Sequence, residues 1–306
     1  MIHDFDPEMI ATPIGTVYWY GAVYSLGFLV VFLWFWARRG LVGLNQKDVV
    51  NFSILFAAGV LVGGRLFDVF VYEFDFYRSR PLAVLNWWHG GMASHGVLLG
   101  GLIATLLFAK RRGIPVLVLL DEIVVPGAFL LAVGRLGNFI EGGVIGSVSD
   151  VPWAVSYPDV AGPRHPVALY ESLKNLLLVP VLIWAIRIWS TGRGVALSLF
   201  VFLYAALRFA VDVFRDYEAV WLGIDTGQVF NLAMAAAGLG MLLYFGLRPW
   251  STHEAPGPAP RSPSSVAVCV LVLLLIYPLG IPTSWTRENI AEIRLNGAGI
   301  VIDRDQ

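Results

Sequence analysis

Four polar side chains recur at helical spacing in the otherwise apolar stretch 194–214 and directly after it. They stand at positions i, i+4, i+8 and i+11, which places them on one face of a helix. These residues are Tyr204, Arg208, Asp212 and Arg215. A charged group inside a membrane span costs at least about 2.5–3.5 kcal/mol, so such a stripe must face protein or a wet cavity. A structural Arg208–Asp212 pair explains part of the stripe but not Arg215 and Tyr204, and we therefore favour a functional interpretation.

A second candidate is the glycine-rich segment Gly134–Gly146, which holds five glycines in thirteen residues. Glycines permit close backbone approach and positive φ. Arg135 and Asn138 supply hydrogen-bonding side chains next to exposed backbone N–H groups, a combination that suits an anionic headgroup. The alternative is a glycine-rich turn with an arginine that reaches the membrane interface. The positions of Arg135 and Asn138 within this segment favour binding of the headgroup, and we include Gly146 among the expected substrate-binding residues.

A third candidate is His95, at the start of an apolar stretch. Trp87 and Trp88 precede it and mark a membrane interface, and Gly91 and Gly96 flank it. Imidazole is the usual general base near neutral pH. The alternative is a core histidine whose hydrogen bonds are satisfied inside the protein.

Other intramembrane charges have simpler explanations. Arg65 and Asp68 stand at i, i+3 and are expected to form a structural pair. Glu171 and Lys174 have the same spacing and could pair locally, but Tyr170 and Glu171 also lie on the side of the membrane that holds the stronger candidates. The five histidines show no metal-ligand spacing, so we expect neither a metal nor a cofactor.

The elements that must position these residues follow from composition. Of 306 residues, 57% are hydrophobic and only 14% are charged, and the mean hydropathy is +0.70. A soluble enzyme of this length needs far more polar surface. A single cysteine, Cys269, excludes a disulfide scaffold, and the net charge of −1 gives no indication of a nucleic-acid partner. We predict an all-α polytopic membrane protein.

Eight apolar stretches are long enough to span a bilayer, which needs about 20 residues. The chain divides into a seven-helix core over 1–248, a Pro- and Ser-rich cytoplasmic linker over 249–264, and an eighth helix with a polar tail over 265–306. The expected spans are 17–36, 50–72, 91–109, 115–134, 167–187, 194–214, 226–247 and 266–282.

Basic clusters follow the first, third, fifth and seventh spans, at Arg38–Lys47, Lys110–Arg112, Arg187–Arg193 and Arg248–Arg261. Such clusters favour the cytoplasm, which places the N-terminus outside. The strong candidates then all fall on the outer half of the membrane, on spans far apart in sequence. Their convergence predicts one site for an anionic lipid, with several arginines and one histidine.

These residues resemble those of the prolipoprotein diacylglyceryl transferases. The ordered match runs from Trp19–Gly21 to Thr226–Gln228. Its most specific parts are Gly-Arg-x-Gly-Asn-Phe at 134–139 and, as a pair with it, Arg-His-Pro at 164–166 through Leu-Tyr-Glu at 169–171.

The resemblance implies transfer of a diacylglyceryl group from phosphatidylglycerol to the lipobox cysteine of a preprolipoprotein, in a bacterial cytoplasmic membrane. A thioether forms and glycerol phosphate leaves. His95 would activate the acceptor thiol, while Arg135 and Arg208 would stabilise the departing phosphate. Substrate-binding residues would be Tyr20, Asn138, Gly146, Tyr170, Glu171, Tyr204, Asp212 and Arg215.

The chain departs from the family pattern at two places in the site. Glu141-Gly142-Gly143 stands where the family usually has Asn-Gly-Glu, and Asp212 replaces a usual Glu. These departures motivate an alternative, a catalytically impaired paralogue that binds anionic lipid or lipoprotein. A transporter or channel is disfavoured, because no internal repeat or midplane pair of broken helices is evident.

Overall fold

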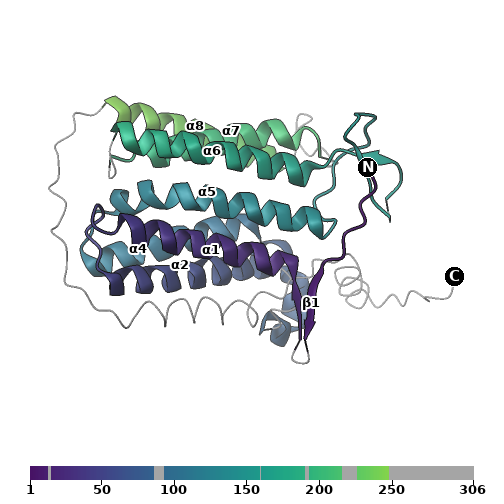
Figure 1. Ribbon diagram of the computed structural model, residues 1–306, viewed down its shortest axis with the longest axis horizontal. Coiled ribbons are helices and arrows are strands. Elements are labelled where there is room, and N and C mark those ends of the chain that lie inside the picture. The colour runs from purple at the N-terminus through teal and green to yellow at the C-terminus, as the bar shows by residue number, and fades with distance from the viewer. Residues whose placement is uncertain (13–14, 86–92, 159, 190–192, 216–225, 248–306) are drawn as a thin grey trace.

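The computed structural model describes residues 1–12, 15–85, 93–158, 160–189, 193–215 and 226–247. Within these ranges seven long helices run side by side along the longest axis (Figure 1), and the predicted all-α polytopic architecture is confirmed. The helices are α1 (Trp19–Arg38), α2 (Gln46–Phe67), α4 (Ser94–Arg112), α5 (Val116–Ile140), α6 (Val167–Trp189), α7 (Val195–Asp212) and α8 (Thr226–Leu247).

Six helices in the described part of the chain are long and apolar enough to cross a membrane: α1, α2, α5, α6, α7 and α8. The helix α4 is not among them, because His95 near its start and Lys110–Arg112 at its end lower its mean hydropathy. A span in α4 therefore stays a prediction. The expected eighth helix at 266–282, the linker and the tail lie outside the described residues.

Glycines bring α2 and α4 into close contact. A Cβ at Gly63 of α2 would meet the Gly96 carbonyl oxygen of α4, and one at Gly96 would meet the Gly63 carbonyl oxygen. Only glycine permits this approach of two backbones. The close packing fixes the start of α4, and with it His95, against the last turns of α2.

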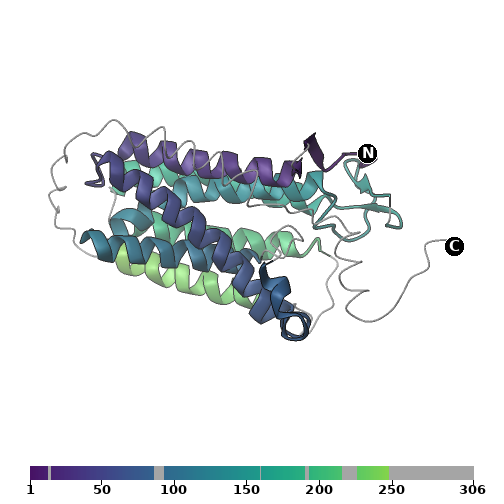
Figure 2. The same ribbon diagram turned by 90° about the horizontal axis from the view of Figure 1, so that it is seen from below.

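The helix α5 joins two groups of helices. It packs against α1 and α4 on one side and against α6 and α7 on the other, while α2 adds to the first group and α8 to the second (Figures 1 and 2). Arg135, in the last two turns of α5, is therefore carried to the place where the two groups meet.

Two ion pairs, each with a buried carboxylate, hold the end of the bundle where the basic loops lie. The fully buried Glu122 of α5 accepts hydrogen bonds from Arg38 (Nε–Oε2 2.5 Å, Nη2–Oε1 2.7 Å) and from Trp34 Nε1 (2.8 Å). Arg112 of α4 pairs with Asp48 of α2 at 2.8 Å. These pairs place the loops after α1 and α4 at the same end, which agrees with the expected alternation of spans.

The opposite end, where the N-terminus lies, carries short elements (Figure 1). They were not predicted from periodicity, because none is long enough to show it. Two antiparallel strand pairs and three short helices are present in the described residues there. They are β1 (Glu8–Thr12), β2 (Gly15–Tyr18), the π-helix η1 (Asp68–Tyr72), α3 (Phe74–Ser79), the 3-10 helix η2 (Pro81–Leu85), β3 (Val155–Ser156) and β4 (Pro163–Arg164).

Candidate active site

Glu171 of α6 is the centre of an ion-pair cluster toward the end of the bundle where the N-terminus lies. Its side chain is fully buried, and cations from three helices approach it. Arg208 Nη1 of α7 lies 3.2 Å from Oε1. Arg135 Nε of α5 and Lys174 Nζ of α6 lie 3.7 and 3.4 Å from Oε2. One carboxylate therefore connects α5, α6 and α7.

Asp212 is the second carboxylate of the cluster. Its Oδ2 lies 3.7 Å from Arg208 Nε, and its Oδ1 lies 3.8 Å from Arg215 Nη1. Asn231 of α8 donates a hydrogen bond of 2.8 Å from Nδ2 to Asp212 Oδ2. Arg208 thus bridges the two carboxylates, so this part of the polar stripe faces protein, as its spacing predicted. Arg215 was expected on the same helical face but lies beyond the last residue of α7, where it pairs as a β-bridge with Gly146. The nearly buried Tyr204 lies on the same stripe.

The six residues that these ion pairs connect carry an excess of positive charge. Four are cations and two are carboxylates, which leaves two positive charges in excess. Between 11% and 14% of each arginine side chain is exposed, and water screens such a site weakly. An anion is attracted there, and guanidinium groups suit the geometry of phosphate. No three His, Cys, Asp or Glu side chains in the described ranges are grouped as metal ligands would be.

The glycine-rich segment forms the end of α5 beside this cluster. Arg135 Nη1 lies 3.4 Å from Asn138 Oδ1, a long hydrogen bond. Gly142 has a φ of +69°, and the N–H of Gly143 donates to the Asn138 carbonyl oxygen at 2.8 Å. This is a Schellman-type helix end, which needs a residue without Cβ. The motif therefore fixes where α5 stops and holds Arg135 and Asn138 together.

Two further glycines of the motif fit α5 against two tyrosines of α1. A Cβ at Gly134 would lie 3.0 Å from the Tyr24 ring, and one at Gly137 would lie 3.0 Å from Tyr20 Cδ2. The Tyr20 hydroxyl donates to the Tyr24 hydroxyl at 3.3 Å. The pair therefore packs against the turn of α5 that carries Arg135.

His95 lies in the first turn of α4, and its Nδ1 shares a hydrogen bond of 3.0 Å with the Tyr72 hydroxyl. Its ring stacks on Phe67, with centroids 5.9 Å apart. Tyr72 ends the π-helix η1, and such helical irregularities are frequent at functional sites. The charges of Arg208 and Arg135 act on His95. This hydrogen bond orients the ring, and Nε2 can accept a proton in the tautomer whose Nδ1–H donates to the Tyr72 hydroxyl oxygen.

Gly146 contributes its backbone to the outer side of the site. Its N–H donates to the His165 carbonyl oxygen at 3.1 Å, and it pairs as a β-bridge with Arg215. A Cβ at this position would lie 2.6 Å from the carbonyl oxygens of His165 and Phe214. Gly146 therefore ties the chain after α5 to the end of α7, while its contact with lipid stays a prediction.

Tyr170 faces the outer loop. Its hydroxyl lies 2.7 Å from Trp153 Nε1, which donates to it, and 3.1 Å from His165 Nδ1. These contacts order the loop between α5 and α6. The role of Tyr170 in lipid binding stays a prediction.

Two residues of the cluster were not selected from the sequence. Lys174 was considered only as a local partner of Glu171, yet its Nζ also lies 4.2 Å from the centre of the Tyr204 ring. Asn231 is 2% exposed and binds Asp212 from α8. An amide within the apolar run 226–247 was the signal that could have identified Asn231.

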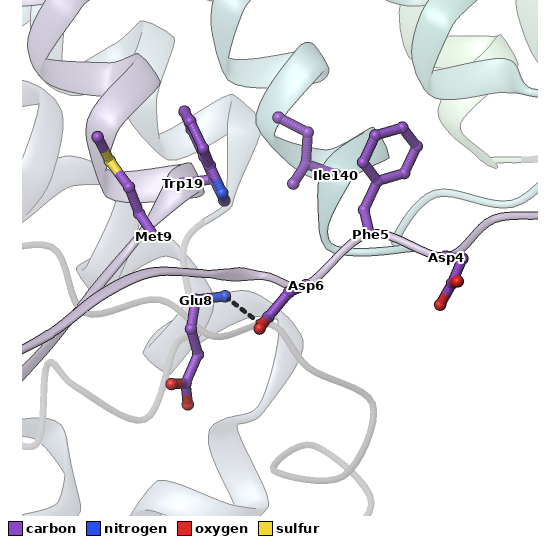
Figure 3. A pocket seen from close by; sticks show the side chains of 7 residues that line it. All are labelled: Asp4, Phe5, Asp6, Glu8, Met9, Trp19 and Ile140. Carbon is purple, nitrogen blue, oxygen red and sulfur yellow. Dashed lines mark hydrogen bonds between the residues drawn. The ribbon is translucent and has the colours of Figure 1, made fainter.

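A separate hollow of about 470 Å³ lies between the N-terminal segment and the outer ends of α1 and α5 (Figure 3). It holds none of the predicted catalytic residues. Its three carboxylates would repel a phosphate, so we assign the anion to the ion-pair cluster instead. The hollow is lined by Asp4, Phe5, Asp6, Glu8, Met9, Trp19 and Ile140.

Comparisons with known proteins agree with this geometry. The family model described as prolipoprotein diacylglyceryl transferase matches residues 7–244. Proteins named phosphatidylglycerol–prolipoprotein diacylglyceryl transferase are similar over most of their length. The protein of Methylobacillus flagellatus is 35% identical over 79% of this chain and 98% of its own, and that of Geobacter sulfurreducens is 37% identical over 75% and 91%. The chain therefore belongs to the prolipoprotein diacylglyceryl transferase family.

Proposed function

We propose that this multi-pass membrane protein transfers the diacylglyceryl group of phosphatidylglycerol to the lipobox cysteine of preprolipoproteins. The names of its relatives state the lipid donor and the class of acceptor. The observation that carries the proposal is the buried cluster around Glu171, whose four cations exceed its carboxylates by two charges. An anionic headgroup supplies the opposite charge.

The charge of the cluster suits the bond changes of the reaction. The cysteine sulfur attacks the carbon of the diacylglyceryl group that bears the phosphate. The carbon–oxygen bond breaks, its electron pair stays on the phosphate oxygen, and glycerol phosphate leaves. The phosphate changes from a monoanion to a dianion, so cations bind the transition state more strongly than the lipid. Arg135 and Arg208 are our candidates for this stabilisation.

His95 is our candidate for the base that accepts the thiol proton. A thiol becomes a strong nucleophile only when it is deprotonated. In the tautomer whose Nδ1–H donates to the Tyr72 hydroxyl oxygen, Nε2 is the nitrogen that can accept the thiol proton. A neutral imidazole ring is what a base requires.

The remaining site residues would position the donor lipid. Tyr20 and Asn138 border Arg135 from α1 and α5. Asp212 holds Arg208 and Arg215 in place, and Tyr204 lies beneath Lys174. Gly146, Tyr170 and Glu171 complete the set of proposed lipid-binding residues. Gly146 and Tyr170 hold the loop between α5 and α6 in place, and Glu171 holds the cations of the cluster.

We place the protein in the bacterial cytoplasmic membrane with its N-terminus outside. The basic residues Arg38 and Lys110–Arg112 support this orientation, since they stand in the last turns of α1 and α4, at the end opposite the cluster. The site then faces the outer leaflet, where a translocated lipobox would meet it.

Complementation of a strain depleted of its own transferase tests the proposal. We expect rescue by the unaltered chain and by Arg111→Gln, an exposed arginine at the far end that serves as a matched control. His95→Ala and Arg135→Ala should not rescue, and full rescue by both would disprove the site assignment. A catalytically impaired lipid binder, the alternative suggested by the sequence, would give no rescue with the unaltered chain.

A further inference from the structure

Lys174 is a charged side chain buried inside a membrane-spanning helix. It lies on α6, one turn further into the bundle than Glu171, and only 5% of the residue is exposed. Lysines are seldom buried without a specific role, because burial disfavours the charged ammonium. A buried lysine therefore needs an explanation in terms of its partners.

Two contacts of Lys174 with described residues lead to the candidate site. Its Nζ lies 3.4 Å from Glu171 Oε2, and it donates to Asn175 Oδ1 at 3.1 Å. The ammonium also lies over the Tyr204 ring, 4.2 Å from its centre, as in a cation–π contact. Lys174 thus connects the central carboxylate to a tyrosine on the polar stripe of α7.

A simple structural ion pair does not account for these contacts. Arg135 and Arg208 already supply two positive charges to the single charge of Glu171. Lys174 is therefore not required to neutralise the carboxylate. Its charge instead raises the net positive charge of the six connected residues from one to two.

The distances around Glu171 indicate how the third cation acts. Its Oε2 accepts no hydrogen bond from the described residues, and Arg135 Nε and Lys174 Nζ share it at 3.7 and 3.4 Å. A carboxylate held by one bidentate arginine has contacts of about 2.7–2.9 Å. Glu171 is therefore shared among three cations and bound tightly by none of them.

We propose that Lys174 is a positioning residue that acts through Glu171. By taking a share of this carboxylate, Lys174 keeps Arg135 and Arg208 from closing onto Glu171, so both arginines remain available to the phosphate of the donor lipid. This inference rests on the proposed function for the identity of the anion. The contacts that carry it hold for any phosphate monoester or diester at the cluster.

The first test measures binding of glycerol 1-phosphate, without any transfer reaction. Lys174→Met removes the charge at similar length, and we expect the Kd for this probe to rise about tenfold, the scale of one charge in a weakly screened site. Lys174→Arg keeps the charge and should stay within about threefold of the unaltered protein. Lys110→Met, an exposed lysine at the far end, is the control. Lys174→Gln replaces Lys174→Met if the latter lowers the folded fraction.

The second test is a double-mutant cycle with Glu171→Gln. Because Lys174 acts through this carboxylate, Lys174→Met should add no further loss of binding once Glu171 is replaced. Equal losses with and without Glu171 would overturn the proposal, since Lys174 would then contact the anion directly. An unchanged Kd in folded Lys174→Met would overturn it as well.

The outcomes separate this proposal from the proposed function. If the unaltered chain binds glycerol 1-phosphate in the predicted pattern but transfers no diacylglyceryl group, the role of Lys174 stands and the function fails. If the chain transfers the group and Lys174→Met leaves both the KM for phosphatidylglycerol and the Kd unchanged, the function stands and Lys174 has no positioning role. The kinetic result we expect is a rise in KM together with a fall in kcat, because Arg135 and Arg208 bind the lipid phosphate and also stabilise the departing phosphate in the transition state.

Discussion

Replacement of Arg208 by alanine should affect catalysis far more than folding. Arg208 contacts Glu171 Oε1 at 3.2 Å and Asp212 Oδ2 at 3.7 Å, and 11% of its side chain is exposed. Its loss lowers the excess charge of the cluster from two to one. Removal of one group that stabilises a developing anion reduces kcat by about 10²–10³-fold, and we expect a loss of this size.

The expected loss of stability is smaller, because neither carboxylate loses all its partners. Glu171 keeps Arg135 and Lys174, and Asp212 keeps Arg215 and Asn231. Breaking a buried pair completely costs about 3–5 kcal/mol. With these partners retained, we expect the free energy of unfolding to fall by about 1–2 kcal/mol.

The assay is release of glycerol phosphate from phosphatidylglycerol in the presence of a lipobox peptide, measured beside the folded fraction of each variant. Arg208→Lys keeps the charge but has one donor group instead of a fork, so an intermediate kcat is expected. Arg111→Gln is the matched control at the far end. Activity of Arg208→Ala above half that of the unaltered protein would refute the reasoning, and so would a loss that only follows the folded fraction.

Three further predictions concern the surroundings of the cluster. Tyr72→Phe removes the hydrogen bond to His95 Nδ1, which contributes about 0.5–1.5 kcal/mol. We therefore expect kcat to fall about three- to tenfold with KM unchanged. An unaltered kcat would exclude the orienting role of Tyr72. Gly146→Ala places a Cβ 2.6 Å from two carbonyl oxygens, so the rate of diacylglyceryl transfer should fall sharply. Gly127→Ala is the control, because no atom lies within 4 Å of its added Cβ and the rate should be unchanged. Asn231→Leu removes a buried hydrogen bond to Asp212, and thermal unfolding should show a loss of about 2 kcal/mol; unchanged stability would contradict the contact.

The membrane helices could be predicted from the sequence because their signal is local. Apolar runs such as 17–36 and 226–247 fall within two residues of α1 and α8 at each end. The basic residues Arg38, in the last turn of α1, and Lys110–Arg112, in the last turn of α4, likewise predicted which helix ends lie together. Hydropathy and loop charge report directly on the cost of burial in lipid, and no tertiary contact is needed to interpret them.

The pairing within the site could be predicted only in part. Helical spacing related Arg208 to Asp212, and the structure has that ion pair at 3.7 Å. Spacing cannot relate Arg135 of α5 to Glu171 of α6, because their contact depends on how two helices rotate against each other. Asn231 was missed for the same reason, since its partner lies on another helix.

The most direct test of the account is transfer by the purified chain. Phosphatidylglycerol labelled in its diacylglyceryl group is supplied in vesicles with a lipobox peptide, and the mass of the peptide is measured. We predict a peptide that gains one diacylglyceryl group at its cysteine, with an equal amount of glycerol phosphate released, and no gain when the peptide cysteine is serine. A folded chain that binds the vesicles and leaves the peptide unmodified would contradict the account.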